Sequence, residues 1–290
     1  MKFVLGRDDL AAVAGAAAAT AGDTPERLEI KPVHKASKGF VNESAADVCE
    51  LAIVTLLQAA AYDKPVALLP VTTLGRLQHQ TLVTLGELGV DDLRGRTVGV
   101  RSWSQTTGVW VRGFLTEQYG IDLSDVDWRT YEDGHIDSYR DPDWVVRAPD
   151  GAKLQADFLE GRLDFGIMGN ELPVDDRIRT AIPDALGVAT DWAVRKGFAP
   201  VNHIVAISAE ANPKTVLAMY DALTEAAAAT GPAPAPVNLN PVGFGALRGP
   251  ITAAARYAFE QQVLPRRVEF DELVERTCEL LGVPPARLGG

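Results

Sequence analysis

Residues 96–119, RTVGVRSWSQTTGVWVRGFLTEQY, decide the fold class of this chain. The apolar run 97–100 predicts a buried strand, and the apolar positions between Val109 and Leu115 indicate a helix after it. The first N–H groups of a helix lack internal partners. A strand, a hydroxyl-rich turn and a helix start therefore predict a corner that binds an anion such as a carboxylate. The alternative is that these hydroxyls only cap the helix.

The polar side chains of this turn are the first candidates for ligand binding. They are Arg101, Ser102, Ser104, Gln105, Thr106 and Thr107. Arg101 leads directly from the strand into the corner, and a guanidinium binds a carboxylate through two parallel hydrogen bonds. Arg112 is a second candidate for this role, with pairing to a surface acid as the alternative. Trp103 is placed to stack on an aromatic ligand, whereas Trp110 is expected in the core.

Composition limits the classes of function. The chain has 290 residues, 47% hydrophobic and 23% charged, which is typical of a globular protein large enough for two domains. The formal net charge is -11, and no clustered basic face is visible, so nucleic acid is not an expected partner. No segment approaches the roughly 18 to 20 continuous apolar residues of a membrane span.

Metal and disulfide sites are not expected. Cys49 and Cys278 lie far apart, and neither belongs to a group with metal-ligand spacing. The first 22 residues contain an alanine run, but charged residues at 7–9 interrupt the apolar stretch that a secretion signal needs. We therefore expect a cytoplasmic protein that begins with a strand and a helix.

Strand and helix patterns alternate along most of the chain, which predicts an α/β fold. Expected strands are 2–5, 28–33, 48–52, 66–71, 81–85, 96–100, 126–130, 165–168 and 203–207. Expected helices are 10–21, 55–62, 105–119, 153–160 and 213–228. The proline-rich connector GPAPAPVNLNP follows, and then helical patterns at 242–262 and 270–281. These last helices are expected on the outside of a domain, where they are candidates for a homodimer contact.

Several segments together carry a family resemblance. They are KFVLGRDD, ADVCELAIVTLL, PVALLPV followed by His79, GRTVGVRSWSQTTGVWVRGFLTEQYGIDLSDVDW, LEGRLDFGI, NHIVAIS and PRRVEFDEL. This set resembles the 4,5-dihydroxyphthalate decarboxylase family. The resemblance implies a two-lobed fold like that of type 2 periplasmic binding proteins, with the ligand in the interlobe cleft. It implies one lobe from 1–84 plus 194–290 and a second from 85–193.

The resemblance also implies residue roles. His79 and His203 occupy positions where the family carries histidine, and histidine can deliver a proton near neutral pH. Glu50 matches an acidic position of the family and is a further candidate proton donor, with a structural carboxylate as the alternative. The loop that begins at Lys35 is expected on the facing wall. Glu171 follows a strand end and is expected to face the cleft.

One departure from the family pattern concerns the substrate. Where the family carries arginines before the histidine, this chain has Gly75 and Gln78, with Arg76 nearby. Fewer cations suit a substrate with fewer carboxylates than a phthalate. The predicted function is a decarboxylase without a cofactor or metal, acting on a small hydroxylated aromatic carboxylate that resembles 4,5-dihydroxyphthalate. The alternatives are a solute-binding protein for a small carboxylate and another lyase or dehydratase on the same fold.

Overall fold

The stretch 96–119 folds as its pattern predicts. In the computed structural model, which describes residues 1–230 and 236–290, Thr97–Val100 forms strand β6 and Thr106–Tyr119 forms helix α4. Gln105 is the N-cap of α4 in an extended conformation. Gly120, at φ 61°, ends the helix in the left-handed region that glycine adopts without strain. The turn 101–105 thus lies at the carboxyl end of a strand and at the start of a helix.

The first sheet joins strands from both ends of the chain. Its order is β2 (Glu26–Arg27), β1 (Lys2–Val4), β3 (Val48–Ala52), β11 (Val201–Ser208) and β4 (Val66–Gly75). The three N-terminal strands are parallel, whereas β11 lies antiparallel between β3 and β4. The register places His203 opposite Ala52 on β3 and Leu74 on β4. This sheet therefore brings His203 to the start of the helix after β3.

The second sheet comes from the middle of the chain. Its order is β10 (Arg179–Thr180), β5 (Leu82–Thr84), β9 (Phe165–Ile167), β6, β7 (Asp127–Thr130) and β8 (Val146–Arg147). Strands β9, β6, β7 and β8 are parallel, so their carboxyl ends share one edge of the sheet. The turn before α4 and the residues after β9 meet at that edge, where ligands of open α/β sheets bind.

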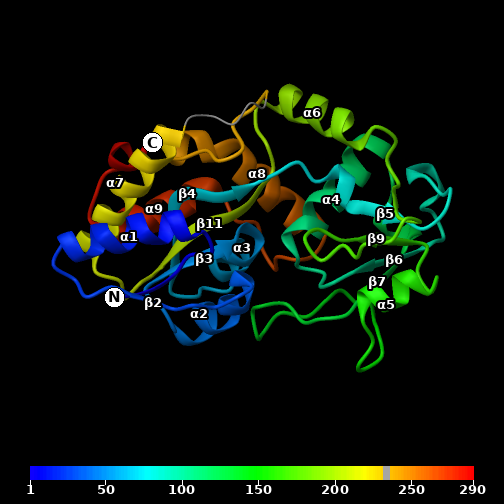
Figure 1. Ribbon diagram of the computed structural model, residues 1–290, viewed down its shortest axis with the longest axis horizontal. Coiled ribbons are helices and arrows are strands. Elements are labelled where there is room, and N and C mark those ends of the chain that lie inside the picture. Colours follow the sequence, from blue (N-terminus) through cyan, green and yellow to red (C-terminus); the bar gives the residue numbers. More distant parts are fainter. Residues whose placement is uncertain (231–235) are drawn as a thin grey trace.

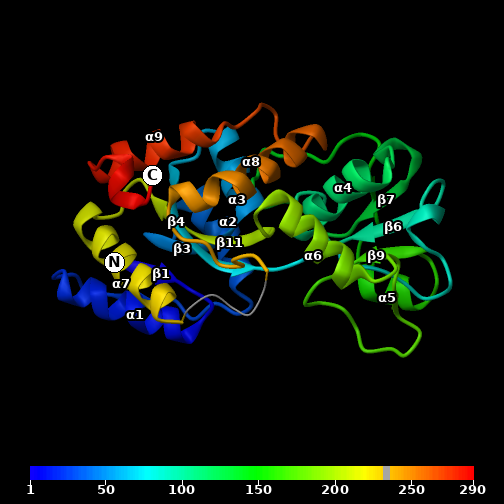
Figure 2. The ribbon, with the colours of Figure 1, turned by 90° about the horizontal axis from the view of Figure 1, so that it is seen from above.

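Helices cover the sheets and connect them (Figures 1 and 2). They are α1 (Asp8–Thr20), α2 (Ser37–Glu43), α3 (Ile53–Ala61), α4, α5 (Leu154–Leu159), α6 (Ala185–Lys196), α7 (Pro213–Thr230), α8 (Phe244–Glu260) and α9 (Phe270–Leu281). Short 3-10 turns lie at Val33–Ala36, His79–Thr81, Val90–Asp92, Leu123–Asp125 and Pro285–Leu288. Figure 2 shows α1 and α7 side by side on the first lobe, away from the second.

Two expectations about secondary structure are wrong. The run 28–33 is not a strand: β2 is Glu26–Arg27, the Leu28 N–H makes one more bond to the Phe3 oxygen, and the Ile30 N–H then turns back to the Leu28 oxygen. Helices α2 and α6 were not expected, since polar residues and glycine interrupt the apolar spacing of both segments. Within the proline-rich connector, residues 231–235 lie outside the described residues.

The chain passes twice between the sheets. It leaves the first sheet after β4, enters the second at β5, and returns through α6 into β11. The strands of the first sheet thus come from residues 2–75 and 201–208, and those of the second from 82–180. The division at 84 and 194 stays a prediction. Across residues 1–230 and 236–290, no helix combines the length and the apolar character needed to cross a membrane.

Candidate functional site

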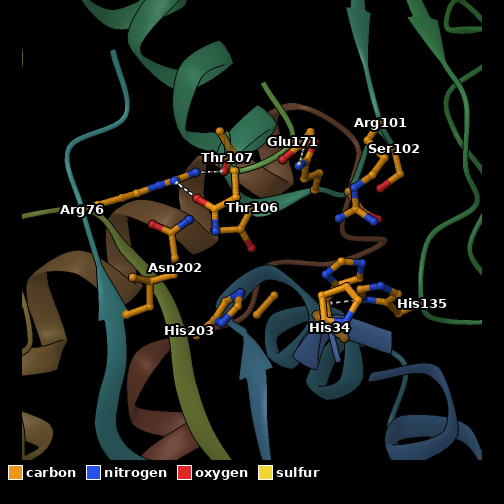
Figure 3. Close-up of a pocket in the computed structure, with 17 residues that line it drawn as sticks. His34, Arg76, Arg101, Ser102, Thr106, Thr107, His135, Glu171, Asn202 and His203 are labelled. Carbon is orange, nitrogen blue, oxygen red and sulfur yellow. Dashed lines mark hydrogen bonds between the residues drawn. The ribbon is translucent and has the colours of Figure 1, made fainter. Parts of the chain in front are cut away.

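A cavity of about 290 Å³ lies where the two lobes meet (Figure 3). The first lobe contributes the start of α3 and residues of β4 and β11, and the second contributes the turn before α4 and the loops after β7 and β9. The lining residues are Pro32, His34, Ala52, Thr55, Leu74, Arg76, Arg101, Ser102, Ser104, Gln105, Thr106, Thr107, His135, Asn170, Glu171, Asn202 and His203. The cavity therefore lies in the interlobe cleft where the family resemblance implies a ligand.

The turn at 101–107 forms one wall of this cavity. All of its predicted candidates line the cavity, and so does Glu171, which accepts a hydrogen bond at 2.9 Å from Gln105 Nε2. The Val54 N–H donates to Thr106 Oγ1 at 3.3 Å, so the starts of α3 and α4 meet here. The backbone N–H groups of Thr106 and Thr107 have no partner within the described chain. Such groups favour an anionic ligand, and their role in binding stays a prediction.

Glu50 and His203 form a hydrogen-bonded pair on the opposite wall. His203 lines the cavity, and its Nδ1 donates to Glu50 Oε1 at 2.7 Å. Glu50 lies behind it, only 6% exposed, and its Oε2 accepts from the Gly6 N–H at 2.8 Å. Burial alone would raise the pKa of Glu50, but the hydrogen bonds from His203 and Gly6 outweigh burial and lower it. A carboxylate at Nδ1 orients the ring, so Nε2 is the nitrogen left for a ligand.

His79, the other expected proton donor, does not line the cavity. Its side chain is 1% exposed and stacks on Phe114 of α4, with ring centroids 4.1 Å apart. Gln118 Nε2 donates to His79 Nε2 at 2.8 Å. Burial lowers the pKa of His79 to about 4, so the ring is neutral near pH 7. The short 3-10 turn at 79–81 directs this ring onto α4, which makes His79 a core residue.

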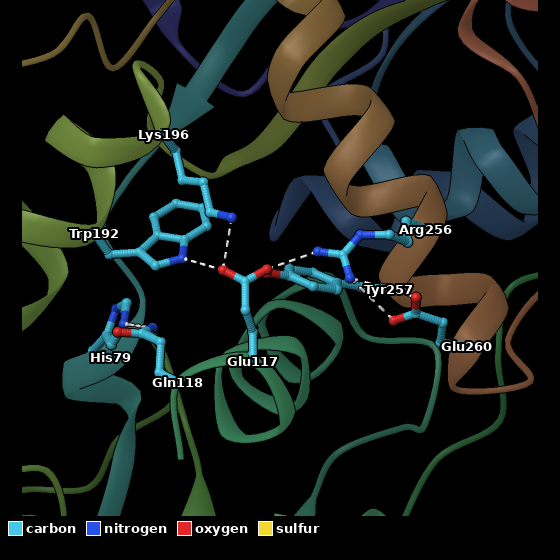
Figure 4. Close-up of polar contacts among 8 residues, drawn as sticks. All are labelled: His79, Glu117, Gln118, Trp192, Lys196, Arg256, Tyr257 and Glu260. Carbon is cyan, nitrogen blue, oxygen red and sulfur yellow. Dashed lines mark hydrogen bonds and ion pairs between the residues drawn. The ribbon is translucent and has the colours of Figure 1, made fainter. Parts of the chain in front are cut away.

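A cluster of hydrogen-bond donors surrounds the Glu117 carboxylate, on the same side of α4 as His79 (Figure 4). Glu117 Oε1 accepts from Lys196 Nζ at 2.8 Å and from Trp192 Nε1 at 3.2 Å. Its Oε2 accepts from Arg256 Nη2 at 2.7 Å and from Tyr257 Oη at 2.8 Å. Glu117 is on α4, two of its partners are on α6 and two on α8. This carboxylate therefore joins an element of the second lobe to a C-terminal helix of the first.

Two histidines outside the predicted site line the cavity, while Lys35 does not. Lys35 is exposed, and its neighbour His34 faces the cavity instead. His135 is half-buried and forms a 2.8 Å hydrogen bond between Nδ1 and Thr55 Oγ1. Its backbone oxygen accepts from Asn42 Nδ2 at 2.8 Å. Burial, followed by the charge of Arg101, lowers the pKa of His135 to about 4.

Sequence reasoning also missed three polar residues of the cavity. Arg76 lines it beside Thr107, and Asn170 and Asn202 stand next to it. Behind the wall, Gln78 Nε2 donates to Asn202 Oδ1, so a position that departs from the family pattern orients a lining residue. Two signals could have placed Arg76 at the lobe junction: it follows the end of β4, and it lies near positions where the family carries arginines.

Arg112 and Trp103 are not ligand-binding residues. Both side chains are fully buried, and the Arg112 guanidinium lies 3.6 Å from the centroid of the Trp103 ring. Arg112 Nε donates to Gln261 Oε1 at 2.8 Å, and Nη2 donates to the backbone oxygen of Trp103. Trp110 is fully buried, as expected. Arg112 therefore supports the turn before α4 from beneath rather than facing the cavity.

No group of three or more His, Cys, Asp or Glu side chains in residues 1–230 and 236–290 is placed to hold a metal ion. The cavity instead offers guanidinium, imidazole, amide and hydroxyl groups. Such groups bind and orient a carboxylate and can exchange a proton with it or with the atom that bears it.

Two curated relatives support the resemblance seen in the sequence. The chain is 29% identical over 177 residues to a protein of Comamonas testosteroni named 4,5-dihydroxyphthalate decarboxylase, covering 56% of this chain and 53% of the relative. It is 29% identical over 162 residues to a protein of the same name from Pseudomonas putida, covering 50% of this chain and 62% of the relative. The chain thus spans between about half and three-fifths of these relatives. No family model matches it.

Solved structures support the two-lobed fold. A structure of XAC2383 from Xanthomonas citri bound to ATP matches with a TM-score of 0.52 and 11% identity, over 91% of this chain and 98% of that one. A putative periplasmic sulfonate-binding protein, SsuA, from Methylobacillus flagellatus matches with a TM-score of 0.51 and 11% identity, over 98% of this chain and 94% of that one. The expected type 2 periplasmic binding-protein-like fold is confirmed.

Proposed function

We propose that this protein is a decarboxylase of a hydroxylated aromatic carboxylic acid, which binds in the interlobe cavity. The observation that carries the proposal is the 2.7 Å pair between Glu50 and His203 on the wall opposite the start of α4. The pair supplies a proton donor, and the helix start supplies a carboxylate site. The similarity to two relatives named 4,5-dihydroxyphthalate decarboxylase supports this reaction class.

The first step of the proposed mechanism is orientation. The substrate carboxylate lies against the N–H groups and hydroxyls of Thr106 and Thr107, and the ring lies in the cavity between the two lobes. A ring hydroxyl donates electron density to the carbon that bears the carboxylate, so the chemistry needs no electron sink from a cofactor. Enclosure between two lobes strengthens each of these polar interactions because it excludes water.

The second step is proton transfer to the ring. Protonated His203 gives the proton on Nε2 to the carbon that bears the carboxylate, and the Glu50 carboxylate stabilises the imidazolium before the transfer. The bond between the ring and the carboxylate then breaks and carbon dioxide leaves. The electron pair of the broken bond stays on the ring and restores its aromaticity. His203 recovers a proton from water. A positioned acid of this kind typically contributes roughly 10²- to 10⁴-fold to the rate.

The test is turnover without any added cofactor. The purified protein is incubated with a panel of hydroxylated mono- and dicarboxylated arenes, and both carbon dioxide release and product mass are followed. We expect a product lighter by one carbon dioxide. A ligand that raises the melting temperature without turnover would favour the solute-binding alternative. A different mass change would favour another lyase or a dehydratase.

A further inference from the structure

The two arginines of the cavity differ in whether an acidic side chain of the protein pairs with them. Arg101 Nη1 forms an ion pair with Glu132 Oε2 at 2.9 Å, so its charge is already balanced by the protein. Arg76 makes no ion pair within residues 1–230 and 236–290. Its Nη1 donates to Asn170 Oδ1 at 2.7 Å and its Nη2 to Thr107 Oγ1 at 3.3 Å, and both acceptors are neutral. Arg76 is therefore the cation that a ligand would balance.

The surroundings of Arg76 are shaped to hold its guanidinium at the cavity wall. A Cβ at Gly169 would lie 2.2 Å from Arg76 Nη2, so only glycine leaves room for the group in this position. Arg76 Nε is buried without a hydrogen-bond partner. Burial lowers the pKa of Arg76, partly offset by the charge of Glu171, so the guanidinium gains from a nearby anion. An unpaired, partly desolvated cation of this kind is a specific carboxylate anchor.

The rest of the cavity does not favour a second carboxylate. His135, with a pKa of about 4, is neutral near pH 7, and burial also lowers the pKa of His34. Glu171 is a carboxylate on the cavity wall. Figure 3 shows Arg76, Asn202 and His203 on one side, and Arg101 with Ser102 on the other. The side away from Arg76 thus combines a neutralised arginine with neutral imidazoles and hydroxyls, which suit ring hydroxyl groups.

We propose that the ligand carries a single carboxylate, which binds Arg76, and that its hydroxyl groups face the Arg101 side. The substrate class is then a hydroxylated aromatic monocarboxylate rather than a dicarboxylate such as 4,5-dihydroxyphthalate. This inference rests on the proposed function, since it names the substrate class of that same site. It also places the carboxylate on the side of the cavity that holds His203, where the proposed proton transfer occurs.

The test compares two ligands that differ by one carboxylate, 3,4-dihydroxybenzoate and 4,5-dihydroxyphthalate, by titration calorimetry at pH 7 and low salt. We expect the monocarboxylate to bind about tenfold or more tightly. Arg76→Gln should weaken its binding by about tenfold or more, and Arg76→Lys should restore part of the loss. Glu132→Gln, at an exposed position, frees Arg101 and should tighten dicarboxylate binding by about tenfold while changing monocarboxylate binding by less than about twofold.

The outcomes separate this inference from the proposed function. Tighter binding of the dicarboxylate by the unmodified protein would overturn the inference, and so would binding of neither ligand. Unchanged monocarboxylate affinity in a folded Arg76→Gln variant would also overturn it. Preferred, Arg76-dependent binding of the monocarboxylate, with no carbon dioxide release from any arene of the panel, would support the inference and contradict the decarboxylase. Carbon dioxide release from the dicarboxylate alone would support the decarboxylase and contradict the inference of a monocarboxylate substrate.

Discussion

Removal of the Glu117 charge should destabilise the protein measurably. Burial alone would raise the pKa of this carboxyl, but hydrogen bonds from Lys196, Tyr257, Trp192 and Arg256 outweigh burial and lower the pKa from 4.5 to about 2. A pKa change of that size corresponds to roughly 3 kcal/mol. The Glu117 side chain is 23% exposed, so solvent screening reduces the contribution of its charge to the unfolding free energy to about 1 to 2 kcal/mol. Glu117→Gln should lose that amount at pH 7.

The pH dependence gives this prediction a second test. Because the pKa of Glu117 is lower in the folded state, its contribution is full above about pH 4.5 and is lost as pH falls toward 2. Urea unfolding of the protein and of Glu117→Gln at pH 7, 5, 4 and 3 should therefore show a constant difference in unfolding free energy down to pH 5 and a shrinking one below.

Glu260 offers a matched control for the same substitution. Among residues 1–230 and 236–290 its one ion-pair partner is Arg256, at 3.4 Å, four residues away on the exposed face of α8. Glu260→Gln should change the unfolding free energy by at most about 0.5 kcal/mol. If Glu117→Gln cost no more than this control, or if the difference stayed constant down to pH 3, the reasoning about the cluster would be refuted.

Three further predictions concern the cavity and its surroundings. Glu50→Gln should lower kcat by about a hundredfold or more in steady-state kinetics with little change in ligand Kd, because it removes the negative charge that stabilises the His203 imidazolium. An equal weakening of ligand binding would contradict this. The pKa of His79 is about 4 in the folded protein against an ordinary 6.5, so protonation of the unfolded chain lowers the unfolding free energy as pH falls between those values. From pH 7 to 5, the unfolding free energy of His79→Gln should therefore fall by about 1 to 2 kcal/mol less than that of the unmodified protein. Equal decreases in the two proteins would contradict the lowered pKa of His79. Gly169→Ala should displace Arg76 and weaken carboxylate binding by about tenfold in calorimetry, whereas Gly86→Ala, whose Cβ meets nothing within 4 Å, should not; equal affinities would contradict the account.

Local sequence patterns predict the fold well where packing and propensity agree. The strand, turn and helix of 96–119 occur as expected, and Phe270–Leu281 matches the predicted helix because its apolar stripe is regular. The pattern fails where tertiary contacts decide. Glu26–Arg27 pairs with β1, and the Leu28 N–H still donates to the Phe3 backbone oxygen at 2.9 Å. The ladder ends there because the Ile30 N–H turns back to the Leu28 oxygen, a local contact that the apolar run does not reveal.

Local sequence patterns predict one wall of the candidate site, whereas Glu50 and His203 of the other wall came from the family resemblance alone. The turn before α4 is continuous in sequence, so its polar residues could be assigned together to the cavity. The other wall is assembled from distant segments: β11 brings His203 beside Glu50, and the loop after β7 brings His135 to Thr55. Local pattern carries no information on such long-range pairs. For the same reason, sequence alone could not show that the His79 ring packs on Phe114.

The most direct test of the account compares His203 with His79, the two histidines that the family resemblance suggested as proton donors, of which only His203 lines the cavity. Carbon dioxide release from the preferred substrate is measured for His203→Asn and His79→Asn, with ligand affinity and folding checked for both. We predict that His203→Asn loses turnover by about a hundredfold or more while still binding ligand, and that folded His79→Asn retains most of it. Retained turnover in His203→Asn, or its loss in folded His79→Asn, would contradict the central claim that His203 is the proton donor.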